Sequence, residues 1–276
     1  MPLHARAVTR AVILARGLGT RMRAADAGAV LDAAQEAAAA AGQKGMMPVG
    51  AHPLLDHVLS TFADAGVTDA CLVVAPEHAA IRAHYEAARP VRLRVHYAVQ
   101  AEPRGTADAL LAAAGFLGDG HAFVGNADNH YPLAALRALG EAGGEAVAGF
   151  DADDLVAGSA IPRERLRRFA LLVRDTAGAL ADIVEKPDDA TWARLAPGAL
   201  VSMNFWVVGP AIVAACRRVR PSARGELELP QAVRLAVHED GATVRVVPVR
   251  GPVLDLSGRR DVAGVAARLA DHAVRL

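Results

Sequence analysis

The stretch AVILARGLGTRMR, residues 11–23, decides the fold class of this chain. Its apolar run 11–14 is typical of a buried parallel strand, and the glycines after it indicate a turn at the carboxyl end of that strand. Open α/β sheets bind ligands at this edge. Gly17 and Gly19 let backbone N–H groups approach a phosphate, while Arg21 and Arg23 add fixed positive charge. The stretch therefore predicts a phosphate-binding loop in an α/β fold.

Strand-like and helix-like segments alternate on either side of this loop. Strand patterns occur at 70–75, 91–99 and 121–124, and helical patterns at 24–42, 53–65, 77–88 and 106–116. This alternation predicts a Rossmann-like, mostly parallel sheet with helices on both faces. After residue 150, strand-like runs at 169–173, 179–185 and 200–208 lack long helices between them and predict an antiparallel extension. Helices near 210–218, 227–239 and 259–273 and a strand at 243–248 complete the expected single domain, residues 1–276.

Composition excludes several functional classes. The 30 basic and 30 acidic residues cancel, so the chain has no general basic field for nucleic acid. Cys71 and Cys216 lie far apart in apolar surroundings, which predicts buried, reduced thiols rather than a metal site. We find no signal-peptide pattern and no apolar run long enough to span a bilayer, and therefore expect a cytoplasmic protein without a membrane partner.

The glycine loop matches neither of the two commonest phosphate-loop patterns. A dinucleotide loop needs a third glycine where Met22 stands, which disfavours a nicotinamide dehydrogenase. A Walker loop needs Lys-Ser/Thr after the second glycine, where this chain has Thr20-Arg21. The remaining pattern, G-x-G-T-R-x-R with Lys44 downstream, resembles the sugar-1-phosphate nucleotidyltransferase family. The resemblance implies that Arg21 and Lys44 are catalytic and stabilise the leaving pyrophosphate. The implied triphosphate-binding residues are Leu14, Ala15, Gly17, Gly19, Thr20 and Arg21.

Three departures from the family pattern lie in the same region. Arg16 stands where the family has Ala or Gly, and Lys44 is followed by Gly45 rather than by proline. The Ala-rich segment 24–42 is also longer than usual. A lid, a subunit contact and a neutral insertion are the open interpretations of this segment.

The segment QAEPRGTADA, residues 100–109, is similar to the base-recognition segment of that family. A glutamine amide can pair with both a donor and an acceptor on a pyrimidine edge, and the Gly105 backbone can complete the pairing. The resemblance assigns Gln100, Pro103, Gly105 and Thr106 to nucleotide binding, and favours uracil or thymine over guanine.

Further segments carry the implied sugar-phosphate and metal residues. Residues 123–129 resemble the Gly-Asp element of the family, and residues 253–261 resemble its second acidic motif, which makes Asp128 and Asp255 the expected Mg²⁺ ligands. Residues 184–187 match an E-K-P motif, and residues 201–206 resemble the strand whose asparagine touches the sugar. The implied sugar-phosphate residues are Asn126, Glu185, Lys186 and Asn204.

These resemblances imply a nucleotide-diphospho-sugar transferase fold. Residues 1–135 would bind the nucleotide, and residues 136–276 would form a sugar-phosphate part with the antiparallel strands. The implied reaction joins UTP or dTTP to a sugar 1-phosphate, with glucose 1-phosphate favoured, and releases pyrophosphate in the presence of Mg²⁺. The attacking phosphate is already ionised, so no general base is required. A cytidylyltransferase for a non-sugar phosphate and a catalytically silent regulatory protein stay open, and a homo-oligomer is compatible with the resemblance.

Overall fold

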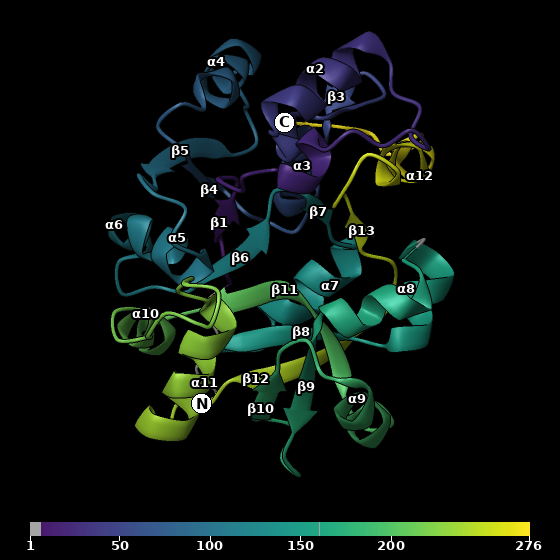
Figure 1. Ribbon diagram of the computed structural model, residues 1–276. Coiled ribbons are helices and arrows are strands. Elements are labelled where there is room, and N and C mark those ends of the chain that lie inside the picture. The colour runs from purple at the N-terminus through teal and green to yellow at the C-terminus, as the bar shows by residue number, and fades with distance from the viewer. Residues whose placement is uncertain (1–6, 160) are drawn as a thin grey trace.

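A computed structural model describes residues 7–159 and 161–276 and has one large central sheet (Figure 1). The strand order is β10-β9-β11-β6-β1-β4-β5, and β8 pairs with β11 and with β12. Strands β5, β4, β1 and β6 are parallel, whereas β11 runs antiparallel to β6, β8 and β9. The strand bounds are β1 Arg10–Leu14, β4 Asp69–Val74, β5 Arg94–Val99, β6 Ala122–Asn126, β8 Ala146–Phe150, β9 Ala170–Arg174, β10 Leu180–Val184, β11 Leu200–Val208 and β12 Arg245–Val249.

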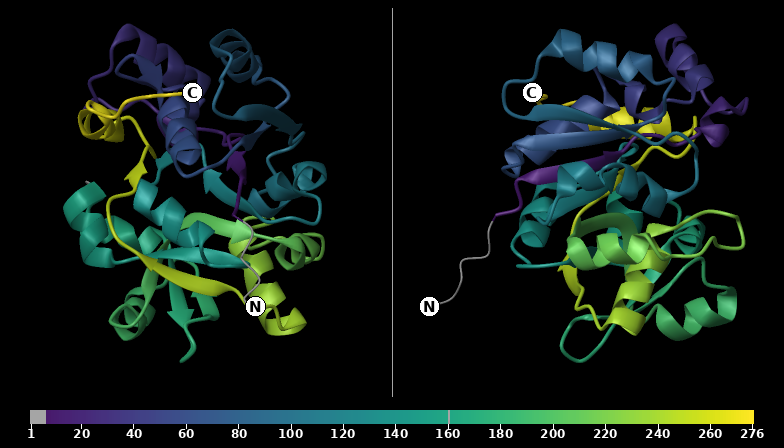
Figure 2. Two further views of the ribbon diagram at one scale, coloured as in Figure 1. Left: turned by 180° about the vertical axis from the view of Figure 1, so that it is seen from behind. Right: turned by 90° about the vertical axis from the view of Figure 1, so that its left-hand side faces the viewer.

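Helices cover both faces of this sheet (Figure 2). Successive side chains of β1 point to opposite faces, so Ala11 and Ile13 enter one hydrophobic core and Val12 enters the other. The first core contains residues of α3 (Leu54–Asp64), α4 (Ala79–Ala88), α7 (Leu133–Gly140), α8 (Ala152–Ser159) and α12 (Asp261–Leu269). The second contains residues of α5 (Thr106–Ala112), α6 (Ala114–Leu117), α10 (Pro210–Cys216) and α11 (Leu229–Asp240).

A register shift in β11 brings the two halves of the sheet together. The strand pairs with β9 up to Ser202 and with β6 from Trp206 onward. Asn204 lies in the gap with a left-handed backbone, φ 54°. The Tyr131 hydroxyl donates to the carbonyl of Met203 at 3.0 Å and holds this irregular segment in place. The shift therefore sets Asn204 at the junction of the parallel and antiparallel parts.

The predicted fold class is confirmed, but several element boundaries are wrong. The segment 106–116 is broken between α5 and α6, and β5 begins at Arg94 rather than at 91. The sequence patterns also missed α7 and β8, which lie between the predicted strands at 121–124 and 169–173. A short 3-10 helix, η2 (Arg163–Arg168), and a helix of seven residues, α9 (Asp189–Leu195), complete the second half.

The predicted helix 24–42 exists only in its second half. The glycine loop leads into α1 (Thr20–Arg23), and α2 (Ala33–Ala41) starts with a capping box between Asp32 and Gln35. Residues 24–32 form no helix. Arg260, just before α12, binds the Asp26 carboxylate through two nitrogens, at 2.7 and 2.8 Å. Gly28 also disfavours a helix here, and its N–H donates to the Asp26 carboxylate at 3.0 Å, so a local turn and a long-range contact replace the predicted helix.

Three histidines link the C-terminal segment to α3. Nδ1 of His57 lies 3.0 Å from Nδ1 of His272, and the Thr61 hydroxyl bonds Nε2 of both His272 and His130. Burial lowers the pKa of His57 and of His272 below the usual 6.5. The folded protein therefore keeps both rings neutral at pH values where exposed histidines would be protonated.

The stability of the folded protein against urea is expected to fall as the pH drops below about 6.5. Unfolded histidines then bind protons that the folded ones refuse, so acid favours the unfolded state. Urea titrations between pH 7.5 and 5.5 measure this change in wild type and in His272→Gln. An equal loss of stability in both proteins over that range would show that His272 does not contribute.

Cys71 and Cys216 are both free and buried, as expected. Burial raises the pKa of the Cys71 thiol to about 11. Within the described part of the chain, no helix has the length and apolar character that crossing a bilayer requires.

Candidate active site

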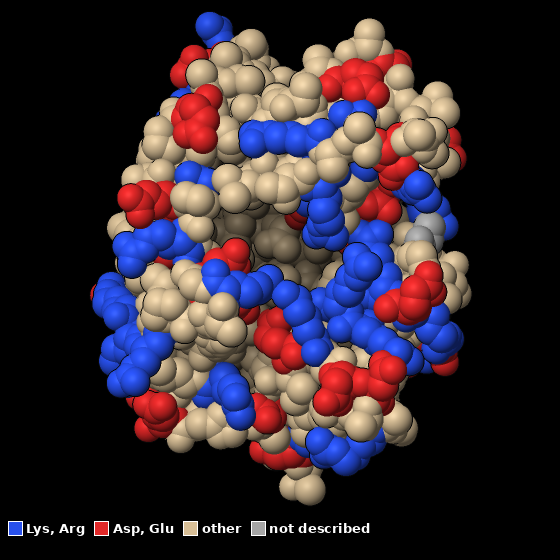
Figure 3. Space-filling model, in the orientation of Figure 1, with Lys and Arg blue, Asp and Glu red and all other residues tan. Residues whose placement is uncertain are grey.

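Two adjoining cavities open at the carboxyl edge of the parallel strands. Their volumes are about 450 and 550 Å³, and both are lined by Arg21, Thr106, Asn126 and Asp128. Figure 3 shows the hollow in the middle of this face, with basic and acidic side chains around it. A ligand in one cavity can therefore reach a ligand in the other.

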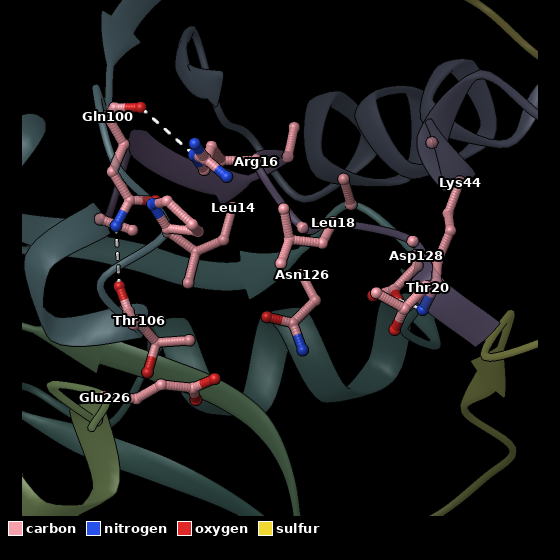
Figure 4. A pocket seen from close by; sticks show the side chains of 18 of the residues that line it. Leu14, Arg16, Leu18, Thr20, Lys44, Gln100, Thr106, Asn126, Asp128 and Glu226 are labelled. Atoms are coloured by element: carbon pink, nitrogen blue, oxygen red, sulfur yellow. Dashed lines mark hydrogen bonds and ion pairs between the residues drawn. The ribbon is translucent and has the colours of Figure 1, made fainter. Parts of the chain in front are cut away.

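The predicted site residues line these two cavities. The first cavity contains Leu14, Ala15, Gly17, Gly19, Thr20, Arg21, Lys44, Gln100, Pro103, Gly105, Thr106, Asn126 and Asp128 (Figure 4). The second contains Arg21, Thr106, Asn126, Asp128, Glu185, Lys186, Asn204 and Asp255. Residues from segments as far apart in the chain as Leu14 and Asp255 are thus brought to one place.

The glycine loop is packed tightly against the end of α2. Gly19 has φ 62°, and a Cβ atom there would lie 2.2 Å from the carbonyl oxygen of Gly42. Gly42 also has a positive φ, 71°, and Arg23 donates to the carbonyl of Ala41 at 2.9 Å. By contrast, a Cβ atom at Gly17 would meet nothing within 4 Å. Gly19 is therefore required by the loop itself, whereas Gly17 leaves open space beside the cavity.

We expect Gly19→Ala to lower the stability of the protein and Gly17→Ala to weaken its nucleotide binding. Gly19→Ala places a side chain on a left-handed backbone and against another backbone, which should cost at least about 1–2 kcal/mol of stability. Gly17→Ala should keep the wild-type melting temperature but weaken triphosphate binding, because its methyl group faces the cavity. Thermal melts and nucleotide titrations measure the two effects. Equal melting temperatures for Gly19→Ala and wild type would contradict the packing argument.

Lys44 lines the first cavity and forms an ion pair with Asp128, which lines both cavities. Lys44 Nζ lies 2.8 Å from Asp128 Oδ2, and both side chains keep some solvent exposure, 16% and 24%. Lys44 begins a 3-10 turn, η1 (Lys44–Met46), and Gly45 lies directly against Ala127. The Lys-Gly departure from the family pattern therefore lets the lysine approach the Asp128 loop closely.

Gln100 has only one free polar atom in this arrangement. Its amide nitrogen donates to the carbonyl of Gly105 at 3.0 Å and to the Asp108 carboxylate at 2.9 Å. The amide oxygen is left to accept a hydrogen bond. The expected pairing of a base with both ends of the amide would therefore require the amide nitrogen to exchange one of these two partners, whereas the amide oxygen is already available. Asp108, in the first turn of α5, is a residue that the sequence patterns missed.

Arg16 connects the glycine loop to the segment after β5. Its Nε donates to the carbonyl of Gln100, and its Nη2 donates to that of Ala101, both at 3.3 Å. The residue is 8% exposed and lines the first cavity beside Leu14 (Figure 4). The large side chain at this position thus belongs to the cavity wall and not to an unrelated surface.

The second cavity has strained backbone at two of its predicted residues. Lys186 and Asn204 both have positive φ values, 42° and 54°, although neither is glycine. Such conformations concentrate at functional sites. Burial raises the pKa of Glu185, and the charge of Glu228 raises it further.

The loop 222–228 also contributes to both cavities and was not assigned to the site from the sequence. Leu227 exchanges backbone hydrogen bonds with Arg104 and Ala107, and the Leu229 N–H donates to the Thr106 hydroxyl. These bonds attach the loop to the predicted base-recognition segment. Arg224 and Glu226 line both cavities, and Arg224 Nη2 lies 2.7 Å from Glu228 Oε1.

A two-stranded ribbon brings the two predicted metal ligands together. Strands β7 (Asn129–His130) and β13 (Leu254–Asp255) are antiparallel, and Asn129 pairs with Asp255. The backbone N–H of Leu256 also donates to the Asp128 carbonyl at 2.8 Å. Burial raises the pKa of Asp255, and the negative charge of Asp128 raises it further. The two carboxylates therefore act on each other inside one cavity.

This pair fits a site for Mg²⁺ that is completed by substrate. Mg²⁺ is commonly held by one or two carboxylates together with phosphates and water. Among the described residues, no group of three His, Cys, Asp or Glu side chains could hold a metal alone. Mutual repulsion between the Asp128 and Asp255 carboxylates would be relieved by a cation between them.

Arg165 is a further site residue that the sequence patterns missed. It belongs to η2 and lines the second cavity. Its Nη2 lies 2.5 Å from Asp255 Oδ2, and its Nη1 lies 2.9 Å from Asp261 Oδ1. Asp255 thus already carries a cationic partner.

Comparisons with known proteins agree with this geometry. Residues 38–250 match the family model described as nucleotidyl transferase. UTP–glucose-1-phosphate uridylyltransferase AglF of Haloferax volcanii is 28% identical over 263 residues, which cover 95% of this chain and 97% of that protein. A glucose-1-phosphate thymidylyltransferase of Neisseria gonorrhoeae is 26% identical over 246 residues, 86% of this chain and 74% of that protein.

A solved structure of UDP-glucose pyrophosphorylase complexed with UDP-glucose has the same fold. Its TM-score is 0.74 at 16% sequence identity, and the match covers 96% of this chain and 100% of that chain. The family model spans well over half of the chain, which confirms the resemblance seen in the sequence motifs. This chain belongs to the nucleotidyl transferase family.

Proposed function

We propose that this protein transfers a nucleotidyl group from UTP or dTTP to a sugar 1-phosphate, with glucose 1-phosphate as the favoured sugar. The names of the relatives support this reaction type and leave the choice between uridine and thymidine open. The sugar phosphate oxygen forms a bond to the α-phosphorus while the bond to the β-phosphate bridging oxygen breaks. Pyrophosphate leaves with that electron pair, and no proton transfer is needed.

The observation that carries the proposal is the shared wall of the two cavities. Arg21, Asn126 and Asp128 line both, so a triphosphate in the first cavity and a phosphate in the second would meet beside them. Two anions approach each other only where cations offset their repulsion. Arg21 and Lys44 supply that charge on the triphosphate side, and Lys186 supplies it on the sugar side.

The base is proposed to lie at the end of the first cavity near Gln100. With its amide N–H groups engaged, Gln100 offers an acceptor, which matches the N3–H donor of uracil or thymine. Residues 1–135 would then hold the nucleotide and residues 136–276 the sugar phosphate, with Glu185 and Asn204 facing sugar hydroxyls.

Mg²⁺ is proposed as the cofactor, held by Asp128 and Asp255. When bound, it would supply positive charge to phosphate oxygens at the shared wall. The protein's own residues position the two substrates: Arg21 and Lys44 orient the departing phosphates, and Lys186 orients the incoming one.

A substrate matrix tests the proposal. The purified protein is incubated with each of ATP, CTP, GTP, UTP and dTTP, against glucose 1-phosphate and against choline phosphate, and pyrophosphate release is measured. We expect release with UTP or dTTP and glucose 1-phosphate. Release with CTP and choline phosphate alone would identify a transferase for a non-sugar phosphate. Nucleotide binding without release in any combination would indicate a regulatory protein, and either result would overturn the proposal.

A further inference from the structure

The feature that the proposed reaction does not use is the guanidinium of Arg165. It bridges two carboxylates, Asp255 and Asp261, and the Asp255 side chain is 6% exposed. The Ser257 hydroxyl lies 3.0 and 2.8 Å from the two oxygens of Asp255, so this carboxylate is almost fully engaged. A divalent cation that approaches Asp255 would meet a positive charge already in contact with it.

Arg165 is held from one side and open to the cavity on the other. Asp261 also accepts a hydrogen bond from the backbone N–H of Gly258 at 2.7 Å, so its position is fixed at the start of α12. Arg165 lines the second cavity and also a small cavity of about 70 Å³ behind it. The Arg165 side chain therefore has free space beside it, and it lines the cavity in which the sugar phosphate is proposed to bind.

The other carboxylate of the pair has an equivalent partner in Lys44. Each predicted metal ligand thus carries its own cation from a different part of the chain, η1 for Asp128 and η2 for Asp255. In a buried site, such charges compensate the repulsion between the two carboxylates. They also oppose the binding of any other cation, because like charges repel most strongly where water is scarce.

We propose that Arg165 is the resident counter-ion of Asp255 in the cation-free protein and that it exchanges this carboxylate for substrate phosphate when a divalent cation binds. The inference rests on the proposed function, because it takes Asp255 as a cation ligand and the second cavity as the phosphate site. It makes Arg165 a residue with two opposite effects. It weakens cation binding to the free protein and strengthens binding of the sugar phosphate.

The first effect is tested without catalysis. Mn²⁺ is titrated into the free protein, and unbound Mn²⁺ is measured by electron paramagnetic resonance. Arg165→Met keeps the aliphatic volume but removes the charge, and its Mn²⁺ affinity should be about tenfold or more higher than that of wild type. Arg168→Met is the matched control: Arg168 is in the same 3-10 helix and lines the same cavity, but it has no ion pair among the described residues. Its Mn²⁺ affinity should change less than twofold.

A second variant keeps the test decisive if Arg165→Met does not fold. Arg165→Lys retains the charge but cannot bridge two carboxylates in the same way, so its Mn²⁺ affinity should rise severalfold. Unchanged or weaker Mn²⁺ binding in a folded Arg165→Met or Arg165→Lys protein would overturn the counter-ion role. Should the wild type release no pyrophosphate in the substrate matrix, a Mn²⁺ shift in these variants would still stand by itself.

The second effect is measured in steady-state kinetics. In Arg165→Met, the KM for the sugar 1-phosphate should rise about tenfold while the KM for the nucleoside triphosphate changes little. An unchanged KM for the sugar 1-phosphate would overturn the exchange onto phosphate. Equal increases in both KM values would instead point to a general loss of site structure, and would overturn it as well.

Discussion

Replacing Lys44 with alanine is expected to lower kcat by about 10²- to 10³-fold while the protein stays folded. The Lys44 ammonium lines the first cavity beside Asp128, where the proposed reaction would develop charge on the departing pyrophosphate. The fold should persist, because the Lys44 side chain lies at the cavity surface and Asp128 is 24% exposed to water even with its partner in place. Pyrophosphate release at saturating substrate measures kcat, and a thermal melt checks the fold.

Two controls separate charge from position in this experiment. Lys44→Arg retains the charge and should recover part of the lost activity. Arg23→Ala removes a cation from the same loop region, but Arg23 bonds the carbonyl of Ala41 and does not line either cavity. Its kcat should stay within severalfold of wild type. Near wild-type turnover of Lys44→Ala would remove the triphosphate assignment of this cavity.

The fold was predictable because its determinants are local. Residues 11–14 form an uninterrupted apolar run before a glycine loop, and this pattern requires a buried strand with a tight turn after it. The motifs that follow later strands were placed at the same edge by the rule that parallel strands end together. For this reason the predicted nucleotide residues line one cavity, although the sequence patterns contain no distances.

The contacts that the sequence patterns missed depend on long-range geometry. Arg165 lies 90 positions from Asp255, and no periodicity or spacing connects them. The segment 24–32 is rich in alanine and favours a helix, yet Arg260, more than 200 positions away, binds Asp26 there. A local signal was present nearby: the capping box of Asp32 and Gln35 marks the true helix start.

The Gln100 amide is partly engaged by other residues of the chain, which its motif does not reveal. Its sequence context predicted a place in the nucleotide cavity, and the side chain lines that cavity. The number of donors left for a base depends on Asp108. This residue lies in the first turn of α5 and accepts a hydrogen bond from the Gln100 amide. A motif can therefore place a side chain without determining which of its atoms are free.

Asp128→Asn is expected to abolish the response of the reaction to Mg²⁺ and to lower kcat by about 10²-fold or more. The substitution preserves shape and leaves an amide oxygen that can still accept from Lys44, so the loss would come from the missing charge. Measuring kcat over a range of Mg²⁺ concentrations distinguishes loss of the cation from loss of the substrate site. Asp154→Asn, at an outer ion pair with Arg250, is the control and should behave as wild type.

The family motif has adjacent Gly and Asp, whereas Asn126 and Ala127 separate Gly125 from Asp128 in this chain, and this altered spacing makes the experiment informative in both directions. Asn126 and Asn129 flank the position and could carry an amide oxygen to the same place, but only Asp128 pairs with Lys44 and acts electrostatically on Asp255. If Asp128→Asn is active while Asn126→Ala or Asn129→Ala is not, the cation ligand is an amide and the assignment of Asp128 is wrong. If only Asp128→Asn is inactive, the result supports Asp128 and Asp255 as the two carboxylates that hold the cation.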